Sequence, residues 1–247
     1  MSQLARRRMD HAPFDTRRYP ILAVRDGYRE WAATYENVVQ DEMDLRLLAR
    51  LETVDWAAAG RALDLACGSG RIGVWLKARG VAHLDGVDFT PEMLAQAEGK
   101  QVYERLVEAD ILATGLAPGT YDLIVEVLAD EHLADLRPLY REAARLAAPT
   151  ATFVLVGYHP HFLMNGVPTH FDRADGQPVT IESHVHLFSD HVKAASAAGW
   201  RLREMDEGVV DDAWLAKKPQ WALLRFHPVS FCMVWERDRP SGAPPAD

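Results

Sequence analysis

Three aspartates and one glycine-rich turn have the types and spacing of a ligand-binding site. Asp64 lies in the short apolar segment 62–66, and a turn of the form GxGxxG follows it at 68–73. Glycines let the backbone approach a ligand closely, and the N-terminus of the following helix favours negative charge. The turn alone fits a dinucleotide site in which Asp88 binds a ribose. Asp64 would repel a pyrophosphate, however, and it suits a ligand that carries an ammonium group.

A third acid extends this pattern. Asp110 ends one predicted strand, as Asp88 ends the strand before it. In open parallel sheets, ligands bind beyond the carboxyl ends of the strands, near the point where the strand order reverses. Acids at three successive strand ends therefore favour a shared binding site over independent, solvated side chains.

Histidines are the candidate proton acceptors. His132 follows the fourth predicted strand and His159 follows the fifth, and both are candidate general bases. Seven of the ten histidines lie between residues 159 and 227, so we predict that this region faces a second reactant. The residues predicted to bind that reactant are Tyr158, His161, His170 and His186.

A metal site in this segment is an alternative. His184 and His186 alternate in an extended stretch, so both rings share one face with Glu182, and such a set can bind zinc or iron. No established metal motif matches, so we favour a pocket or polar loop without metal.

The elements that position these residues alternate between strand and helix. Strands are predicted at 62–66, 84–89, 102–109, 121–128 and 151–158, with helices at 71–79, 90–98, 135–148 and 189–198. This alternation predicts an α/β fold, a Rossmann-like doubly wound sheet with mostly parallel strands. Segments 200–210 and 229–236 are expected to pair as a C-terminal antiparallel hairpin and complete seven strands.

We expect a single domain over residues 1–239. Its parts are an N-terminal helical cover (1–60), a ligand-binding core (61–158), an insertion after the fifth strand (159–191) and the C-terminal hairpin (200–238), with a disordered tail at 240–247. Within the cover, Tyr28, Trp31 and Tyr35 share one helix face, which we interpret as core packing.

Composition limits the classes of partner. The chain has 247 residues, is 48% hydrophobic, and carries a formal charge of −9. An acidic surface argues against nucleic acid as a partner. The chain has two cysteines, and we identify no secretory leader and no run of about 18 apolar residues. We therefore predict a cytoplasmic protein with no membrane partner. The oligomeric state is left open.

Four segments together resemble the motifs of class I S-adenosylmethionine-dependent methyltransferases. They are Leu63-Asp64-Leu65-Ala66-Cys67-Gly68-Ser69-Gly70, Val87-Asp88-Phe89-Thr90-Pro91-Glu92-Met93-Leu94, Asp110-Ile111, and Tyr121-Asp122-Leu123-Ile124-Val125-Glu126-Val127-Leu128. The resemblance covers roughly residues 28–158, in the order and spacing of the family. Ala66 departs from it, since many members have glycine there, and we expect the extra methyl group to be tolerated.

The resemblance implies S-adenosylmethionine as the cofactor and a role for each matching residue. Asp64 would help hold the ammonium group, Asp88 both ribose hydroxyls, and Asp110 the adenine amino group. The full set of residues implied to bind the cofactor is Tyr35, Asp64, Ala66, Gly68, Gly70, Asp88, Phe89, Met93, Asp110, Ile111 and Glu126.

The predicted function is methyl transfer to a small-molecule acceptor by in-line displacement. The protein must align the acceptor, and a base is needed only for some acceptors. Three alternatives stay open: an NAD(P)-dependent oxidoreductase that uses the glycine turn, a metal-assisted methyltransferase that uses the histidine-rich insertion, and a cofactor-binding protein without catalysis.

Overall fold

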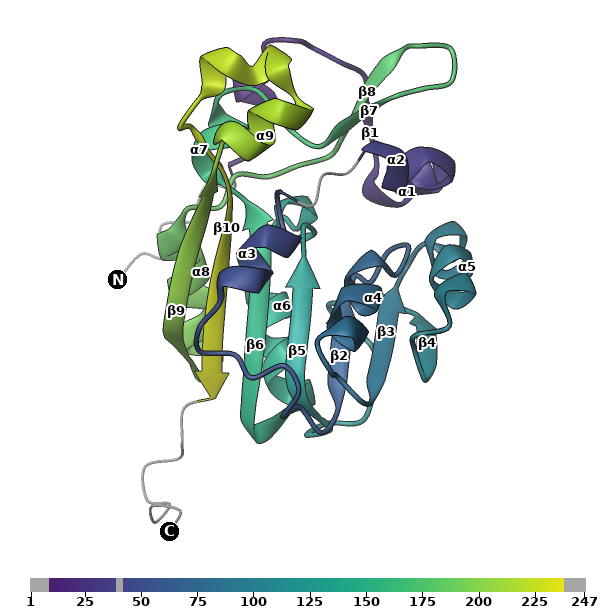
Figure 1. Cartoon of the computed structure of the whole chain (residues 1–247), viewed down its shortest axis with the longest axis vertical. Helices are drawn as coiled ribbons and strands as arrows, with labels where there is room; N and C mark the ends of the chain where they lie inside the picture. Colours follow the sequence, from purple (N-terminus) through teal and green to yellow (C-terminus); the bar gives the residue numbers. More distant parts are fainter. Residues whose placement is uncertain (1–8, 39–41, 238–247) are drawn as a thin grey trace, which may run out of the picture.

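A computed structural model describes residues 9–38 and 42–237, so the tail predicted at 240–247 lies outside the described residues. In the described chain one sheet has seven strands, in the order β4-β3-β2-β5-β6-β10-β9 (Figure 1). Their bounds are β2 Ala62–Leu65, β3 Leu84–Asp88, β4 Arg105–Glu108, β5 Tyr121–Val127, β6 Ala147–Tyr158, β9 Trp200–Val209 and β10 Pro228–Arg237. The first five are parallel, and β10 is antiparallel to both β6 and β9. The predicted fold class and C-terminal hairpin are confirmed.

Alternation along the buried strands builds a core on each face of the sheet. Leu63 and Leu65 of β2 pack with α6 (Arg137–Leu146) and α8 (Phe188–Ala197). Ala62, on the opposite face, packs with α3 (Leu45–Arg50) and α4 (Arg71–Ala78). Helix α5 (Pro91–Lys100) lies beside β3 and β4 (Figure 1). A strand that is covered on both faces of the sheet must carry apolar side chains on both faces. The side chains of β2 follow this rule, with Asp64 as the exception.

The N-terminal segment and the insertion form a second sheet together. β1 (Ile21–Leu22) pairs in parallel with β8 (Pro178–Ile181), which pairs antiparallel with β7 (His170–Asp172). Short helices complete this end of the molecule: η1 Ala12–Phe14, α1 Val24–Trp31, η2 Ala32–Thr34, α2 Tyr35–Val38, η3 Asp130–His132, α7 Pro160–Met164, α9 Asp212–Lys217 and η4 Pro219–Leu224. The N-terminal part is therefore not helical throughout, because Ile21 and Leu22 find strand partners about 160 residues away along the chain.

Several element ends differ from the sequence prediction, among them the end of α6 and the start of α8. Helix α6 ends at Leu146, and Pro149 lies inside β6, at a register shift opposite β5 where its missing N–H is tolerated. Helix α8 begins one residue early, and its N-cap is Leu187 rather than Ser189. There the Asp190 carboxylate accepts a 3.1 Å hydrogen bond from the Leu187 N–H.

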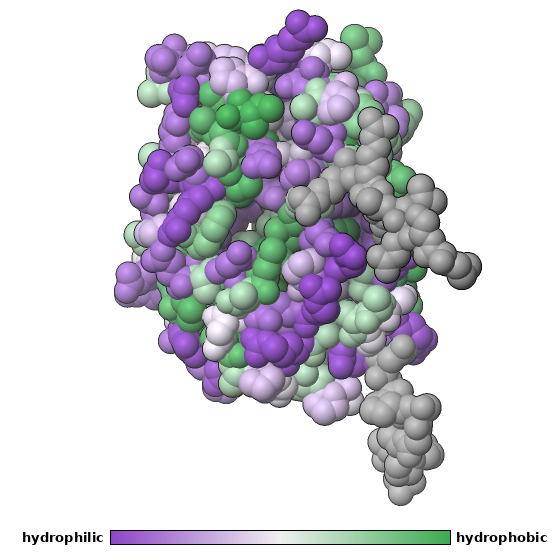
Figure 2. Space-filling model, turned by 180° about the vertical axis from the view of Figure 1, so that it is seen from behind, coloured by the Kyte–Doolittle hydropathy of each residue, from purple (hydrophilic) through white to green (hydrophobic). Residues whose placement is uncertain are grey.

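The outer surface fits the acidic, polar composition. Seen from behind, it is largely hydrophilic, with hydrophobic residues gathered in patches around a hollow near its middle (Figure 2). Over the described residues, none of the helices combines the length and the apolar character that crossing a bilayer requires.

Candidate functional site

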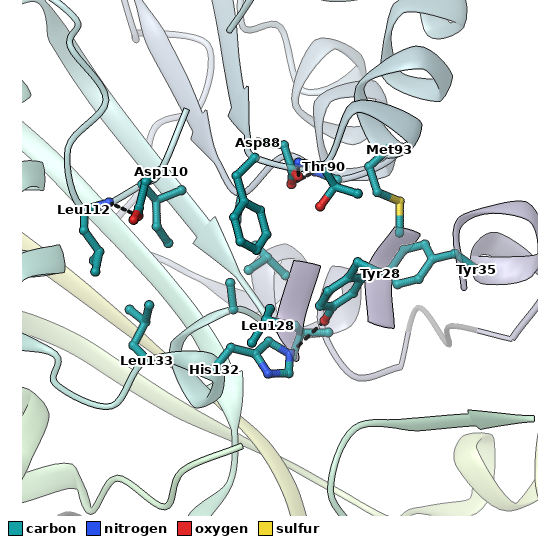
Figure 3. Close-up of a pocket in the computed structure, with 17 residues that line it drawn as sticks. Tyr28, Tyr35, Asp88, Thr90, Met93, Asp110, Leu112, Leu128, His132 and Leu133 are labelled. Carbon is teal, nitrogen blue, oxygen red and sulfur yellow. Dashed lines mark hydrogen bonds between the residues drawn. The ribbon is translucent and has the colours of Figure 1, made fainter. Parts of the chain in front are cut away.

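A cavity opens beyond the carboxyl ends of β2, β3 and β5, where the strand order reverses (Figure 3). Its lining comes from the glycine turn, the ends of three strands and α1. The lining residues are Val24, Tyr28, Tyr35, Ala66, Gly68, Asp88, Phe89, Thr90, Met93, Asp110, Ile111, Leu112, Val127, Leu128, Ala129, His132 and Leu133. Eight of the eleven predicted cofactor residues are thus brought to one cavity, which we call the first chamber: all except Asp64, Gly70 and Glu126.

The turn after β2 has left-handed backbone at alternate positions. Ala66, Gly68 and Gly70 have φ angles of +59°, +52° and +86°. A Cβ atom at Gly70 would lie 3.0 Å from the Cα atom of Ala97 in α5, so only glycine lets the two segments approach this closely. Ala66 occupies a left-handed conformation that favours glycine, so its cost is backbone strain rather than the volume of its methyl group.

The third glycine of the turn, Gly73, leaves room for the side chain of Tyr103. A Cβ atom at Gly73 would lie 2.3 Å from the hydroxyl oxygen of Tyr103. That hydroxyl donates a 2.7 Å hydrogen bond to Oδ2 of Asp64, which is 1% exposed. Burial raises the pKa of Asp64 to about 7. Asp64 therefore lies behind the turn, held by Tyr103, and does not line the first chamber.

Asp88 accepts two backbone hydrogen bonds in the first chamber, one on each carboxylate oxygen. Its Oδ2 accepts a 2.9 Å hydrogen bond from the Gly68 N–H and its Oδ1 accepts a 2.8 Å bond from the Thr90 N–H. Burial raises its pKa, against the opposing effect of these hydrogen bonds. Each carboxylate oxygen keeps a second lone pair, so Asp88 can still accept two ligand hydroxyls.

Asp110 is exposed at the opposite side of the chamber from Tyr35 (Figure 3). Its Oδ1 accepts a 2.8 Å hydrogen bond from the Leu112 N–H, which leaves Oδ2 for a ligand. Phe89, Met93 and Ile111 add apolar surface between the acids. This arrangement suits a flat, polar-edged ring whose faces are apolar.

Tyr28 and His132 close the chamber on its other side (Figure 3). The Tyr28 hydroxyl lies 2.9 Å from His132 Nε2, and His132 Nδ1 lies 2.7 Å from the Glu182 carbonyl oxygen. A carbonyl only accepts, so Nδ1 carries the proton, and in the neutral ring Nε2 accepts from Tyr28. Of the two predicted catalytic residues, His132 lines the first chamber, and His159 lines neither this chamber nor the neighbouring cavity.

A second cavity, which we call the second chamber, adjoins the first. Tyr28, Tyr35 and Leu128 line both chambers. The remaining lining of the second chamber is Trp31, Met43, Glu131, Tyr158, Phe162, Val167, Thr169, His170, Lys218 and Trp221. Tyr158 and His170, predicted to bind the second reactant, therefore lie together here.

Other predicted residues lie outside both chambers. His159 Nε2 lies 2.8 Å from a carboxylate oxygen of Glu207, and His161 Nε2 lies 3.2 Å from His227 Nδ1. His186 Nε2 donates a 2.7 Å hydrogen bond to the Leu133 carbonyl oxygen. Glu126 is buried, and its Oε1 accepts a 2.7 Å hydrogen bond from the Ala129 N–H.

The candidate metal ligands are not assembled. His184 Nε2 lies 3.8 Å from Glu182 Oε1, but His186 is engaged by a carbonyl group. Across residues 9–38 and 42–237, no group of three or more histidine, cysteine or acidic side chains is arranged to hold a metal ion.

Sequence reasoning missed several chamber residues. The predicted core packing of the aromatic stripe is confirmed, because Trp31 is buried in a hydrophobic cluster against which Tyr28 packs. Tyr28 and Trp31 also line chambers, which the sequence prediction did not include. Lys218 carried no signal in the sequence, because nothing in its spacing places it beside an aromatic pocket. The aromatic stripe at i, i+3 and i+7 was the available signal, since three large rings on one face suit a ligand as well as a core.

Comparison with known proteins finds similarity to methyltransferases. Residues 63–155 match the model of a methyltransferase domain. The chain is 34% identical over 119 residues to a demethylmenaquinone methyltransferase of Thermus thermophilus, covering 45% of this chain and 54% of that protein. It is 33% identical over 103 residues to a malonyl-[acyl-carrier protein] O-methyltransferase of Enterobacter lignolyticus. This match covers 42% of this chain and 39% of that protein. The chain thus spans about half the length of the curated relatives it matches, or less.

A solved structure shares the fold over a longer stretch. An S-adenosylmethionine-dependent methyltransferase from Mesorhizobium loti superposes with a TM-score of 0.63 at 22% identity, covering 79% of this chain and 98% of that one. Because 79% of the chain is covered, the likeness in fold extends beyond residues 63–155.

Proposed function

We propose that the chain is a class I S-adenosylmethionine-dependent methyltransferase and that it catalyses methyl transfer from S-adenosylmethionine to a small-molecule acceptor. Its similarity to methyltransferases in sequence and in fold supports this proposal. The observation that carries this proposal is the first chamber. There Asp88, Asp110 and the Ala66–Gly68 turn meet at the reversal of strand order.

The residues of the first chamber fit this cofactor. Asp88 would accept the ribose hydroxyls, Asp110 an adenine amino hydrogen, and Phe89, Met93 and Ile111 would cover the ring. S-adenosylmethionine supplies an activated methyl group on a sulfonium. The protein's remaining task is to bind, orient and keep water from the reactants.

The second chamber is the proposed acceptor site. It shares a wall with the first chamber at Tyr28, Tyr35 and Leu128, so an acceptor there would lie next to the cofactor. The names of the relatives point to small or carrier-bound acceptors, a quinone precursor in one and malonyl-[acyl-carrier protein] in the other. His132 is the proposed candidate base in the wall, and His159 is proposed to act only indirectly, since it lies with Glu207.

Calorimetry with S-adenosylhomocysteine and, separately, with NADH tests the proposal. We expect S-adenosylhomocysteine to bind with micromolar or tighter affinity and NADH not to bind. Binding of NADH alone would favour the oxidoreductase alternative. Binding of S-adenosylhomocysteine with no methylated product from a broad panel of amines, phenols, thiols and carboxylic acids would favour the non-catalytic alternative.

A further inference from the structure

The second chamber contains one buried acid with an unused oxygen. Glu131 is 1% exposed and lies in η3, directly after β5. Its Oε1 accepts a 3.0 Å hydrogen bond from the Thr169 hydroxyl and lies 3.6 Å from His132 Nε2. Its Oε2 is buried and has no hydrogen-bond partner. A buried carboxylate oxygen without a partner costs free energy that a ligand carrying a donor or a positive charge would recover.

Six of the thirteen residues that line the second chamber are tyrosine, tryptophan or phenylalanine. The rings that line the second chamber are those of Tyr28, Trp31, Tyr35, Tyr158, Phe162 and Trp221. The faces of such rings attract cations, and the attraction is strongest where water is excluded. An acid that shares a chamber with several aromatic rings therefore matches an organic ammonium group better than it matches a neutral alcohol.

The same surroundings disfavour an acidic acceptor at this point. A carboxylate ligand next to Glu131 would place two like charges together in a site of low polarity. Lys218, a positively charged side chain of the same chamber, lies with its ammonium 5.1 and 6.0 Å from the ring centroids of Trp221 and Trp214, and among the described residues it forms no ion pair with Glu131.

We propose that the acceptor is a primary or secondary amine, which binds in the second chamber as an ammonium ion against Glu131 and within the aromatic rings. This inference rests on the proposed function, since it names the substrate class of the same site. Glu131 is then a binding group that touches the acceptor nitrogen.

Glu131 also provides a route for the proton. The bound ammonium gives one proton to the Glu131 carboxylate and becomes a neutral amine with a free lone pair. That lone pair forms the new N–C bond to the methyl carbon while the C–S bond breaks and its electron pair stays on sulfur. The products are a methylated ammonium, a neutral thioether and a protonated Glu131, which returns its proton to water. Burial raises the pKa of Glu131 to about 7, so it can accept and release a proton near neutral pH.

Matched probes test the charge preference. Purified protein saturated with S-adenosylhomocysteine is titrated with methylamine, cyclohexylamine and 2-phenylethylamine, and with the alcohol and carboxylic acid of the same shape as each. Calorimetry and tryptophan fluorescence report binding, because Trp31 and Trp221 line the chamber. We expect at least one amine to bind about tenfold more tightly than its alcohol, and its acid not to bind.

Two variants test whether the preference for amines over alcohols depends on Glu131. Glu131→Gln keeps the shape and removes the charge, so we expect the amine-to-alcohol ratio to fall to about twofold or less. Glu98→Gln, an exposed acid of α5, is the matched control and keeps the wild-type ratio. An unchanged affinity for S-adenosylhomocysteine shows that the Glu131→Gln variant is folded. If the variant does not fold, the amine-to-alcohol affinity ratios of the wild-type protein decide whether the acceptor is an amine.

The outcomes separate the two proposals. If no amine is preferred over its alcohol in the wild type, or if the preference survives Glu131→Gln, the amine assignment is wrong while the proposed function stands. If the wild-type protein does not bind S-adenosylhomocysteine at all, the proposed function itself fails.

Discussion

The hydroxyl of Tyr28 lies 2.9 Å from Nε2 of His132, and the two rings meet edge to face at 84° with centroids 5.3 Å apart. Tyr28 comes from α1 and His132 from η3, the short helix that follows β5, so this contact holds the N-terminal segment against the end of the sheet. It also forms part of the wall between the chambers, because Tyr28 lines both and His132 lines the first.

Loss of this hydrogen bond is expected to weaken the fold more than the cofactor site. Tyr28→Phe keeps the ring and leaves His132 Nε2 without its donor, so the free energy of unfolding should fall by about 1–2 kcal/mol. Urea denaturation measures this change, and S-adenosylhomocysteine affinity should stay within about threefold, as the wall keeps its shape. Tyr19→Phe, which removes a hydroxyl near the surface, is the control and should change stability little. A Tyr28→Phe variant as stable as Tyr19→Phe would mean that the hydrogen bond contributes nothing.

Asp88 is expected to dominate cofactor affinity. Asp88→Ala removes both acceptors of the proposed ribose contact and the two hydrogen bonds that hold Gly68 and Thr90. Since hydrogen bonds to a charged group contribute about 1.5–3 kcal/mol, calorimetry should show S-adenosylhomocysteine binding weakened by at least about tenfold. Glu92→Ala, an exposed acid in the first turn of α5, should bind as the wild type does. Equal affinity of the two variants would remove Asp88 from the site.

The close packing of Gly73 against Tyr103 predicts a large effect from a single methyl group. Gly73→Ala would place a Cβ atom 2.3 Å from the Tyr103 hydroxyl oxygen, so that ring must move and release Asp64. We expect a loss of about 1–3 kcal/mol in the free energy of unfolding. Gly99→Ala, in α5 with nothing within 4 Å of the new atom, should instead stabilise by about 0.5–1 kcal/mol.

A second substitution checks the cause. Adding Tyr103→Ala to Gly73→Ala removes the clashing ring, so the double variant should lose less stability than the two single losses added together. Additive losses would show that Gly73 acts through something other than Tyr103.

The buried Asp64 predicts a pH dependence of stability. Its folded-state pKa of about 7 lies above the ordinary value of about 3.9, so between these values the folded chain holds a proton that the unfolded chain has released. The stability that this group contributes is full below about pH 4 and is lost as the pH rises to about 7. Asp64→Asn, which is neutral at every pH, should therefore gain stability relative to the wild type by more than about 1 kcal/mol between pH 5 and pH 8. A difference between the two proteins that does not vary with pH would contradict a buried, protonated Asp64.

Local patterns determined much of the fold. Apolar runs such as 121–128, the proline after Thr90 and the glycine turn at 68–73 are short-range signals, and the structure has a strand, a helix start and a tight turn at those places. Strand–helix alternation also implied the parallel sheet, because consecutive parallel strands need a crossover. The acids at strand ends could be grouped for the same reason, since parallel strands end on one edge.

The acceptor side of the site was decided only by the tertiary structure. The sequence determined which side chains are present at 28, 131 and 169, but these residues are brought together by β1 pairing with β8 and by the contact of Tyr28 with His132. Such contacts join segments more than 100 residues apart, and no local periodicity encodes which partner a short strand or a single hydroxyl will find. Likewise, Asp64 sits in the predicted strand, but its hydrogen bond to Tyr103 and its burial depend on how the turn packs against α5. The sequence by itself thus determined the elements and the acids at their ends, and long-range packing decided which of those acids face a ligand.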